Sequence, residues 1–501
     1  MGNKTNNLHK VKSTKLLTSY FLLLALSACS LAPKFDKPEI ATPEKYKEDG
    51  KSDSYDASMW VEAKLLEDND RKQWWKIFAD KELDALENQA KESNQSLKII
   101  EARVSQSRDI ASAVKGGFFP SVNLGANAVR TKQSSASLAA FGVTGETKPY
   151  TIYSGEGVVS YEADLFGRVR DSYKASKLDA DAQEALYNEA LLALQADVAQ
   201  HYFSIRALDS ERRLLQATVR VREEAARIMG KRFKEGAVGE QDNSRTISEL
   251  ASSQADLIAL NRQRARLEHA LAVLLGKMPS EFSLKESPLE KIMPPKIPAG
   301  LPSTLLARRP DIAAALKSME AANTRIGVAK TAFFPRLNLT ASAGLASTSL
   351  GNVFDWSGRT WALGQVAGNA LSLPIFNGGT NSANLRAAKA SYEESIATYR
   401  QQVLVAFRDV EDNLVGQNLL AKQSIQQDLA AKSASRTTAL AQKRYNEGET
   451  DYFEVVDSQR VSLAAQRSAV QLRGQRFITT IALIRALGGG WEDVEVAKVK
   501  K

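Results

Sequence analysis

The chain has 501 residues, of which 43% are hydrophobic and 25% are charged, and this composition is typical of a folded protein rather than a disordered one. It contains three histidines, His9, His201 and His269, and one cysteine, Cys29. A disulfide framework, a Cys/His zinc site and a Cys–His catalytic pair therefore lack the residues that they need. The formal charge of +9 is compatible with binding to nucleic acid or to an anionic membrane. Whether it indicates such a partner depends on where the charges lie along the chain.

The first 29 residues predict an export signal. Four lysines precede an apolar run from Leu16 to Leu26, which is shorter than the roughly 20 residues that span a bilayer but has the length of a signal-peptide core. The run ends in Leu-Ser-Ala-Cys, which resembles a bacterial lipobox and implies cleavage before Cys29 and a diacylglycerol on its thiol. Ser30 follows, and by resemblance to enteric lipoproteins this residue permits transfer to the outer membrane. An ordinary secretory peptide with an incidental cysteine is the alternative.

Cleavage changes the charge argument. The mature chain would keep 63 basic and 58 acidic residues, a formal charge of +5, because the segment 1–28 holds four lysines and no acidic residue. The case for nucleic acid weakens accordingly, and we expect no nucleic-acid partner.

A long internal repeat occupies most of the mature chain. The motif Phe-Phe-Pro at 118–120 recurs at 333–335, an offset of 215, and the segment 232–236 recurs at 444–448, an offset of 212. The two offsets nearly agree, which indicates two equivalent halves rather than a short-period solenoid. A proline-rich connector separates the halves.

Each half predicts long helices. Glycine and proline are absent from 168–229, 240–275, 380–415, 417–447 and 449–473. These stretches are far longer than an average globular helix, and glycine-containing tips at 234–236 and 446–448 would turn them into antiparallel hairpins, with the first break beginning at Gly230. Narrow apolar stripes along them are typical of coiled-coil pairing.

Strands with one apolar face are predicted between the helices. Apolar residues alternate with polar ones at 122–128 and 337–345, and the segments 152–162 and 361–373 are the expected hairpin partners. Strands of roughly ten residues suit a transmembrane barrel. Four strands cannot close one, so two or three copies would be required; a soluble hairpin packed on the helices is the other interpretation.

Five motifs in order along the chain resemble the outer membrane factor family, the TolC-like channels, and most closely its lipoprotein branch that serves resistance-nodulation-division (RND) efflux pumps. They are Trp-Trp-Lys-Ile-Phe-Ala-Asp at 74–80, Asp-Leu-Phe-Gly-Arg at 164–168, Leu-Leu-Ala-Arg-Arg-Pro-Asp-Ile at 305–312, Ile-Gly-Val-Ala-Lys at 326–330 and Leu-Pro-Ile-Phe-Asn-Gly-Gly at 373–379.

The resemblance implies a fold that is mainly α with membrane β: a homotrimer whose 12-stranded β-barrel in the outer membrane continues as a long periplasmic 12-helix α-barrel, with two pseudo-repeats per protomer. It also implies a periplasmic adaptor and an inner-membrane RND transporter as partners. Trp74, Trp75 and Phe78 would belong to a belt around the middle of the α-barrel.

The resemblance further implies a gate at the periplasmic end, on the hairpin of the second half, which would be the inner hairpin. Position by position, Phe453 would be the apolar constriction, and Glu454 and Asp457 would form acidic rings. Glu454 and Asp457 share a helix face, and rings of carboxylates are typical of cation-selective pores.

A counter-charge is expected near such rings. The offset of 212 places Asp242 opposite Glu454 and Arg245 opposite Asp457, so Arg245, with Asp242, is the predicted latch that bonds to the inner hairpin and holds the gate closed. Thr450 stands where some family members carry an arginine, which leaves the latch partner open. The adaptor is expected to grip the tips, which contain Gly236, Gly239, Gly448 and Thr450.

The predicted domains run in order along the chain. They are a lipoprotein signal peptide (1–28), an N-terminal tether and equatorial segment (29–80), a helix (81–117), a first transmembrane hairpin (118–163), a first helical hairpin (164–278), a proline-rich linker (279–304), a helix (305–332), a second transmembrane hairpin (333–373), a second helical hairpin (374–488) and a C-terminal tail (489–501).

The predicted function is a passive, lipid-anchored outer membrane duct for drugs or other small toxic compounds, with the lipid on Cys29 and no catalytic residue, cofactor or metal. A channel for protein secretion or metal-ion efflux is one alternative. A coiled-coil structural lipoprotein with no pore is the other.

Overall fold

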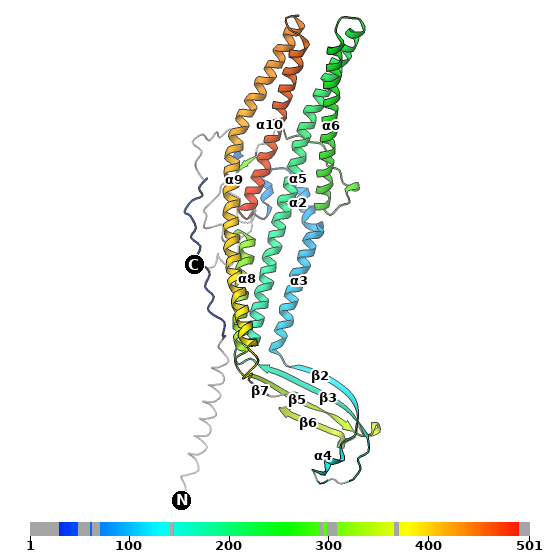
Figure 1. Ribbon diagram of the computed structural model, residues 1–501, viewed down its shortest axis with the longest axis vertical. Coiled ribbons are helices and arrows are strands. Elements are labelled where there is room, and N and C mark those ends of the chain that lie inside the picture. The colour runs from blue at the N-terminus through cyan, green and yellow to red at the C-terminus, as the bar shows by residue number, and fades with distance from the viewer. Residues whose placement is uncertain are drawn as a thin grey trace. The chain divides into compact units, whose positions relative to one another are not determined.

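The computed structural model describes residues 30–48, 61–62, 71–140, 142, 145–289, 294–297, 308–364 and 370–489. The predicted signal peptide, Cys29, much of the proline-rich linker and all but the first residue of the predicted C-terminal tail lie outside the described residues. The chain divides into two compact units (Figure 1). Unit 1 comprises Met1–Pro38, Ser105–Gln183 and Ala315–Thr398; unit 2 comprises Glu39–Val104, Glu184–Ala314 and Tyr399–Lys501.

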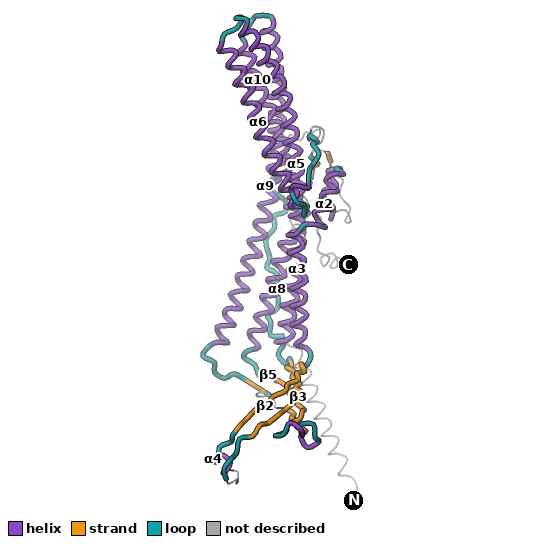
Figure 2. Tube along the Cα trace, turned by 90° about the vertical axis from the view of Figure 1, so that its right-hand side faces the viewer, coloured by secondary structure: helices purple, strands orange, loops and turns teal. Residues whose placement is uncertain are grey.

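Unit 1 contains an antiparallel sheet, which lies at the ends of the long helices (Figure 2). Its strands are β2 (Ser121–Thr131), β3 (Tyr150–Ala163), β5 (Arg336–Ser347), β6 (Arg359–Gly364) and β7 (Leu371–Ser372), in the order β2-β3-β5-β6 with β7 also paired to β5. Pairing of β3 with β5 joins the two predicted hairpins into one sheet, a contact that the sequence prediction did not include. The single strand expected over 361–373 is two short strands, β6 and β7, and residues 365–369 between them lie outside the description.

Apolar side chains at alternate positions of the outer strands β2 and β6 are exposed, as are the residues between them. Val122 and Leu124 of β2 are 73% and 89% exposed, and Trp361 and Leu363 of β6 are each 76% exposed. Alternation of this kind is the pattern of a strand whose one face meets lipid or another chain. Among the described helices, none combines the length and the apolar character needed to cross a bilayer.

Four long helices repeat across the two halves of the sequence. They are α5 (Arg168–Lys234), α6 (Glu240–Leu274), α9 (Thr380–Asn446) and α10 (Tyr452–Ala486). The helices α5 and α9 each have 67 residues and α6 and α10 each have 35, and each helix of the second pair begins 212 residues after its counterpart. At about 1.5 Å per residue, α5 and α9 are each about 100 Å long. The prediction of two pseudo-repeats is confirmed.

Glycine does not interrupt these helices. The predicted break at Gly230 is wrong, because α5 continues to Lys234, and α9 and α10 likewise continue through Gly416 and Gly474. A Cβ at Gly474 would lie 2.7 Å from the Cβ of Ala207 on α5, so only glycine permits this approach between α5 and α10. Burial of the helix face outweighs the roughly 1 kcal/mol helix penalty of a glycine.

The remaining elements are shorter than these four helices. They are η2 (Arg71–Phe78), α2 (Lys81–Ser93), α3 (Gln95–Lys115), η3 (Gly116–Phe118), α4 (Ser135–Ala139), η4 (Pro279–Glu281), α8 (Pro310–Thr331), η5 (Leu350–Asn352), η6 (Trp356–Gly358) and the parallel pair β1 (Val61–Glu62) and β4 (Pro295–Lys296).

The helix expected over 81–117 is divided at Asn94. This residue has extended backbone angles, its side chain accepts a hydrogen bond from the Leu97 amide (2.8 Å), and its amide donates to the Leu274 carbonyl (2.9 Å). Asn94 therefore ends one helix and caps the next, a role that its side chain favours.

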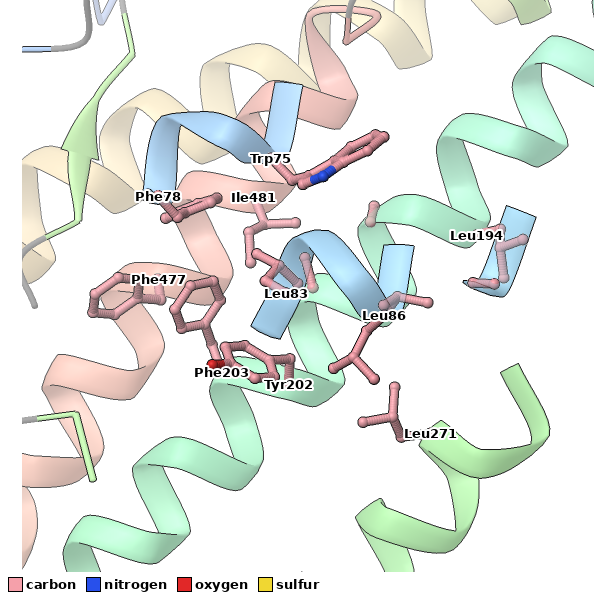
Figure 3. Close-up of a cluster of buried hydrophobic side chains, with 14 of the residues drawn as sticks. Trp75, Phe78, Leu83, Leu86, Leu194, Tyr202, Phe203, Leu271, Phe477 and Ile481 are labelled. Carbon is pink, nitrogen blue, oxygen red and sulfur yellow. The ribbon is translucent and has the colours of Figure 1, made fainter. Parts of the chain in front are cut away.

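The core of unit 2 is rich in aromatic side chains (Figure 3). Phe203 of α5 stacks on Phe477 of α10 with ring centroids 4.6 Å apart, and Phe78 packs 4.8 Å from Phe203. Trp74 and Trp75, which the sequence analysis assigned to a belt, belong to this same buried cluster. Contacts between helices distant in sequence thus hold unit 2 together.

Candidate functional site

The tips of the two helical hairpins turn at glycines in the left-handed region. Gly236 has a φ of 72° and Gly448 a φ of 78°, a conformation in which other residues are strained. The amide of Ala237 donates to the Arg232 carbonyl (2.8 Å), and the equivalent amide of Glu449 donates to the Arg444 carbonyl (2.9 Å). Both helices therefore end in the same glycine cap.

Beyond these caps, the second helix of each hairpin begins at a different kind of residue. Gly239 precedes α6 without a side-chain cap, whereas the Asp451 carboxylate precedes α10 and accepts a hydrogen bond from the Glu454 amide (3.2 Å). A carboxylate at a helix N-terminus is favourable for both the hydrogen bond and the helix dipole.

An apolar cluster fastens the two tips to each other within unit 2. It contains Met229 from α5, Ala441 from α9, and Tyr452, Val455 and Val456 from α10. Burial raises the pKa of the Tyr452 hydroxyl above its usual value. The cluster fixes which face α10 turns towards α5, and so decides which side chains of α10 remain outside it.

The predicted constriction residue Phe453 contacts the predicted latch residue Arg245. The guanidinium carbon of Arg245 on α6 lies 4.5 Å from the centroid of the Phe453 ring, within the range of a cation–π interaction. The Phe453 side chain is 50% exposed. Arg245 therefore reaches the inner hairpin through the aromatic ring, and no ion pair joins it to Asp457 among the described residues.

The predicted ring residue Glu454 is paired within its own hairpin. Its carboxylate accepts a hydrogen bond from the Arg444 guanidinium (2.9 Å) and a short one from the Thr450 hydroxyl. Asp242, which the repeat offset placed opposite Glu454, forms no side-chain hydrogen bond or ion pair in the described part of the chain. Two positions that are equivalent under the repeat are therefore not necessarily in contact.

The predicted ring residue Asp457 lies exposed one helical turn after Phe453. No hydrogen bond or ion pair to it is present within the described ranges. Asp457 and Glu454 are three residues apart on α10, so their carboxylates lie on the same face of the helix, where water reaches them.

Two further contacts between α6 and α10 were missed by the sequence analysis. Glu249 of α6 pairs with Arg460 of α10 (3.6 Å) and with Arg222 of α5 (3.0 Å). Farther from the tips along the same helices, Asp256 of α6 pairs with Arg467 of α10 (3.0 Å). We call the three α6–α10 contacts, Arg245–Phe453, Glu249–Arg460 and Asp256–Arg467, the hairpin ties.

The described residues contain no group of three or more His, Cys, Asp or Glu side chains that is arranged to hold a metal. The Nδ1 atom of His201 lies 2.8 Å from the Asp197 carbonyl one turn earlier on α5, an ordinary contact within a helix.

The family model described as "Outer membrane efflux protein" matches residues 86–277 and 301–489. The chain belongs to the outer membrane efflux protein family. It is 30% identical to the outer membrane protein OprJ of Pseudomonas aeruginosa, over 95% of this chain and 96% of that one. It is 32% identical to the solvent efflux pump outer membrane protein SrpC of Pseudomonas putida, over 94% and 97%. It is 27% identical to the probable outer membrane lipoprotein SilC of Salmonella typhimurium, over 96% and 99%.

The solved structures give the same answer for the fold. The structure of the Campylobacter jejuni CmeC outer membrane channel superposes with a TM-score of 0.82 at 26% identity and covers 94% of this chain and 98% of that chain. The predicted family, the fold class of helices with membrane strands and the outer membrane location are confirmed, and this member of the outer membrane efflux protein family is an outer membrane channel of an efflux pump.

Proposed function

We propose that three copies of this chain form a passive exit duct that catalyses no reaction. The sheet of unit 1 has four strand positions across, because β6 and β7 both pair with the same edge of β5. A transmembrane barrel needs at least about eight strands, and three copies supply twelve. The exposed apolar side chains on β2 and β6 support a place for these strands against lipid and neighbouring copies.

The tips of the helical hairpins are the gate of this duct. The observation that carries this assignment is the row of hairpin ties, in which charged side chains of α6 contact charged or aromatic side chains of α10. The duct opens when the α9/α10 hairpin moves over the α5/α6 hairpin and these ties break. In the assembled trimer, Phe453 is the apolar constriction, and Glu454 and Asp457 supply rings of three carboxylates that select cations.

The tip loops are the docking surface for a periplasmic adaptor, which couples the duct to an inner-membrane RND transporter. Gly236, Gly239 and Gly448 are exposed, and Thr450 is half-buried against Glu454. An adaptor that binds these loops better when the ties are broken shifts the gate towards the open arrangement.

A lipid on Cys29 anchors each copy to the outer membrane. The relative SilC is named a probable outer membrane lipoprotein, and the Leu-Ser-Ala-Cys motif at 26–29 supports the same processing here. The acyl chains add a membrane contact to that of the strands.

Small apolar toxic compounds are the proposed cargo, since the relative SrpC is named for solvent efflux. Deletion of the gene is expected to lower the minimal inhibitory concentrations of dyes and hydrophobic antibiotics, and a plasmid copy should restore them. Measurement on copper and silver salts in the same strains is the comparison. Unchanged tolerance to dyes and antibiotics, together with lost tolerance to metal salts, would contradict the proposed cargo.

A further inference from the structure

The first described residues of the chain follow a defined course without regular secondary structure. We call residues 30–48 the N-terminal strap. Its two ends contact different parts of the chain, 30–33 within unit 1 and 46–48 within unit 2. The sequence predicts a sorting role for Ser30 and, for the rest of the strap, only that of a tether.

At its first end, the strap is hydrogen-bonded to a buried carboxylate. The Ser30 hydroxyl donates to Asp171 Oδ2 at 2.8 Å, and Asp171, in the first turn of α5, is only 2% exposed. Burial raises the pKa of this carboxyl above its usual value. A buried carboxylate is costly unless it is hydrogen-bonded. The Ser30 hydroxyl therefore supplies a hydrogen bond that the Asp171 carboxylate needs.

Helix α8 provides the other wall of this contact. A Cβ at Gly327 would lie 2.6 Å from the Ala32 nitrogen, 2.7 Å from the Ala32 Cα and 2.7 Å from Asp171 Oδ2. The buried side chain of Asn323, one turn earlier, donates to the Pro33 carbonyl at 2.8 Å. The strap backbone therefore lies directly against the α8 backbone, in a space that exists because residue 327 has no side chain.

At its second end, the strap is held by α9. Both oxygens of the Glu411 carboxylate accept backbone hydrogen bonds, from the amides of Lys47 (2.7 Å) and Glu48 (3.1 Å). Tyr46 is 2% exposed, and its ring centroid lies 6.2 Å from that of Phe407. Docking at 46–48 alone would leave the 15 residues 31–45 between Ser30 and Tyr46, a segment that could extend over roughly 50–60 Å.

We infer that Asp171, Asn323 and Gly327 form a docking slot for residues 30–33, and that this slot fixes the point at which the lipid on Cys29 enters the membrane. The inference rests on the proposed lipidation of Cys29. The Cα of Cys29 is one peptide unit, about 3.8 Å, from that of Ser30. The slot is also close to the sheet along the chain, because α5 begins five residues after β3 ends and α8 ends five residues before β5 begins.

Without the slot, the lipid would be attached to a long undocked segment. With the slot, the lipid is held at a fixed position beside the strands. Holding the acyl group near its site of insertion raises its effective concentration there, because the N-terminal segment loses no further conformational entropy when the acyl group inserts. Each protomer then has two membrane contacts at a set distance, its strands and its acyl chains.

The test is the mobility of a spin label at Lys34→Cys in the purified full-length protein. Lys34 is exposed, one residue beyond Pro33. The label is expected to be slow in the otherwise unchanged chain and markedly faster after Ser30→Ala or Gly327→Ala. Gly230→Ala is the matched control, since a Cβ there meets only Asn243 Oδ1 at 3.7 Å and should leave the label slow.

Ser30→Ala leaves the helices untouched, so its result stands even where Gly327→Ala fails to assemble. Equal mobility in the unchanged chain, Ser30→Ala and Gly327→Ala would overturn the slot. Mass spectrometry of the N-terminal peptide tests the lipid separately: a peptide without acyl chains but with a slow label would refute lipidation and leave the slot in place.

Discussion

Replacement of Asp209 by alanine is expected to lower the apparent free energy of unfolding by about 3–5 kcal/mol, because the buried Arg206 and the largely buried Arg264 each lose one of their two carboxylate partners. Asp209 is fully buried on α5. Its carboxylate accepts hydrogen bonds from Arg264 (2.6 Å), from Arg206 (3.3 Å) and from the backbone amide of Ser287 in the proline-rich linker (3.0 Å). Loss of Asp209 therefore weakens both the pairing of α5 with α6 and the hold on the linker.

The measurement is guanidinium unfolding followed by tryptophan fluorescence, with Trp74 and Trp75 in the same buried core as reporters. Asp179→Ala is the control, because Asp179 and its partner Arg325 are 40% and 49% exposed and such a pair contributes less than about 1 kcal/mol. Similar losses in the two variants would show that the buried network does not stabilise the fold.

Removal of two hairpin ties at once, by Arg245→Ala with Arg460→Ala, is expected to make cells sensitive to vancomycin, a large antibiotic that the outer membrane otherwise excludes. A half-exposed ion pair or cation–π contact contributes about 1 kcal/mol or less, so one variant alone shifts the gate little. The proposed trimer repeats both contacts three times, and the double variant therefore removes six.

Arg262→Ala is the matched control for this experiment. Arg262 is an exposed arginine on α6 that lies between the ties and the core of unit 2, and no ion pair to it is present in the described part of the chain. Its replacement should leave vancomycin tolerance unchanged. A double variant that tolerates vancomycin as well as the unchanged protein does would remove the ties from the gate.

The repeat made the architecture predictable from the sequence. The recurrence of 232–236 at 444–448 located both tip glycines, and the absence of glycine and proline located most of each long helix. These features are local, and a glycine cap needs a positive φ whatever surrounds it. The glycines inside helices could not be placed in this way, because Gly474 is set by the approach of Ala207 from a helix distant in sequence.

The contacts at the candidate gate were only partly predictable. The resemblance and the offset of 212 brought out Phe453 and Arg245, which the structure places in contact. The offset alone paired Arg245 with Asp457 and gave no reason to select Glu249 or Arg460. Pairing between α6 and α10 depends on how one hairpin is shifted along the other, and that shift is decided by buried residues such as Met229 and Val455 rather than by the charges themselves.

The central claim is that this chain forms a conducting duct closed at its helical tips, and the conductance of the purified trimer in planar bilayers tests it most directly. The unchanged protein is expected to conduct cations in small, discrete steps. Asp457→Ala should raise the conductance of the closed state, because the shorter alanine side chains leave a wider opening at this level of the proposed constriction. Absence of any conductance, even with Asp457→Ala and Glu454→Ala combined, would contradict the duct and favour a structural lipoprotein.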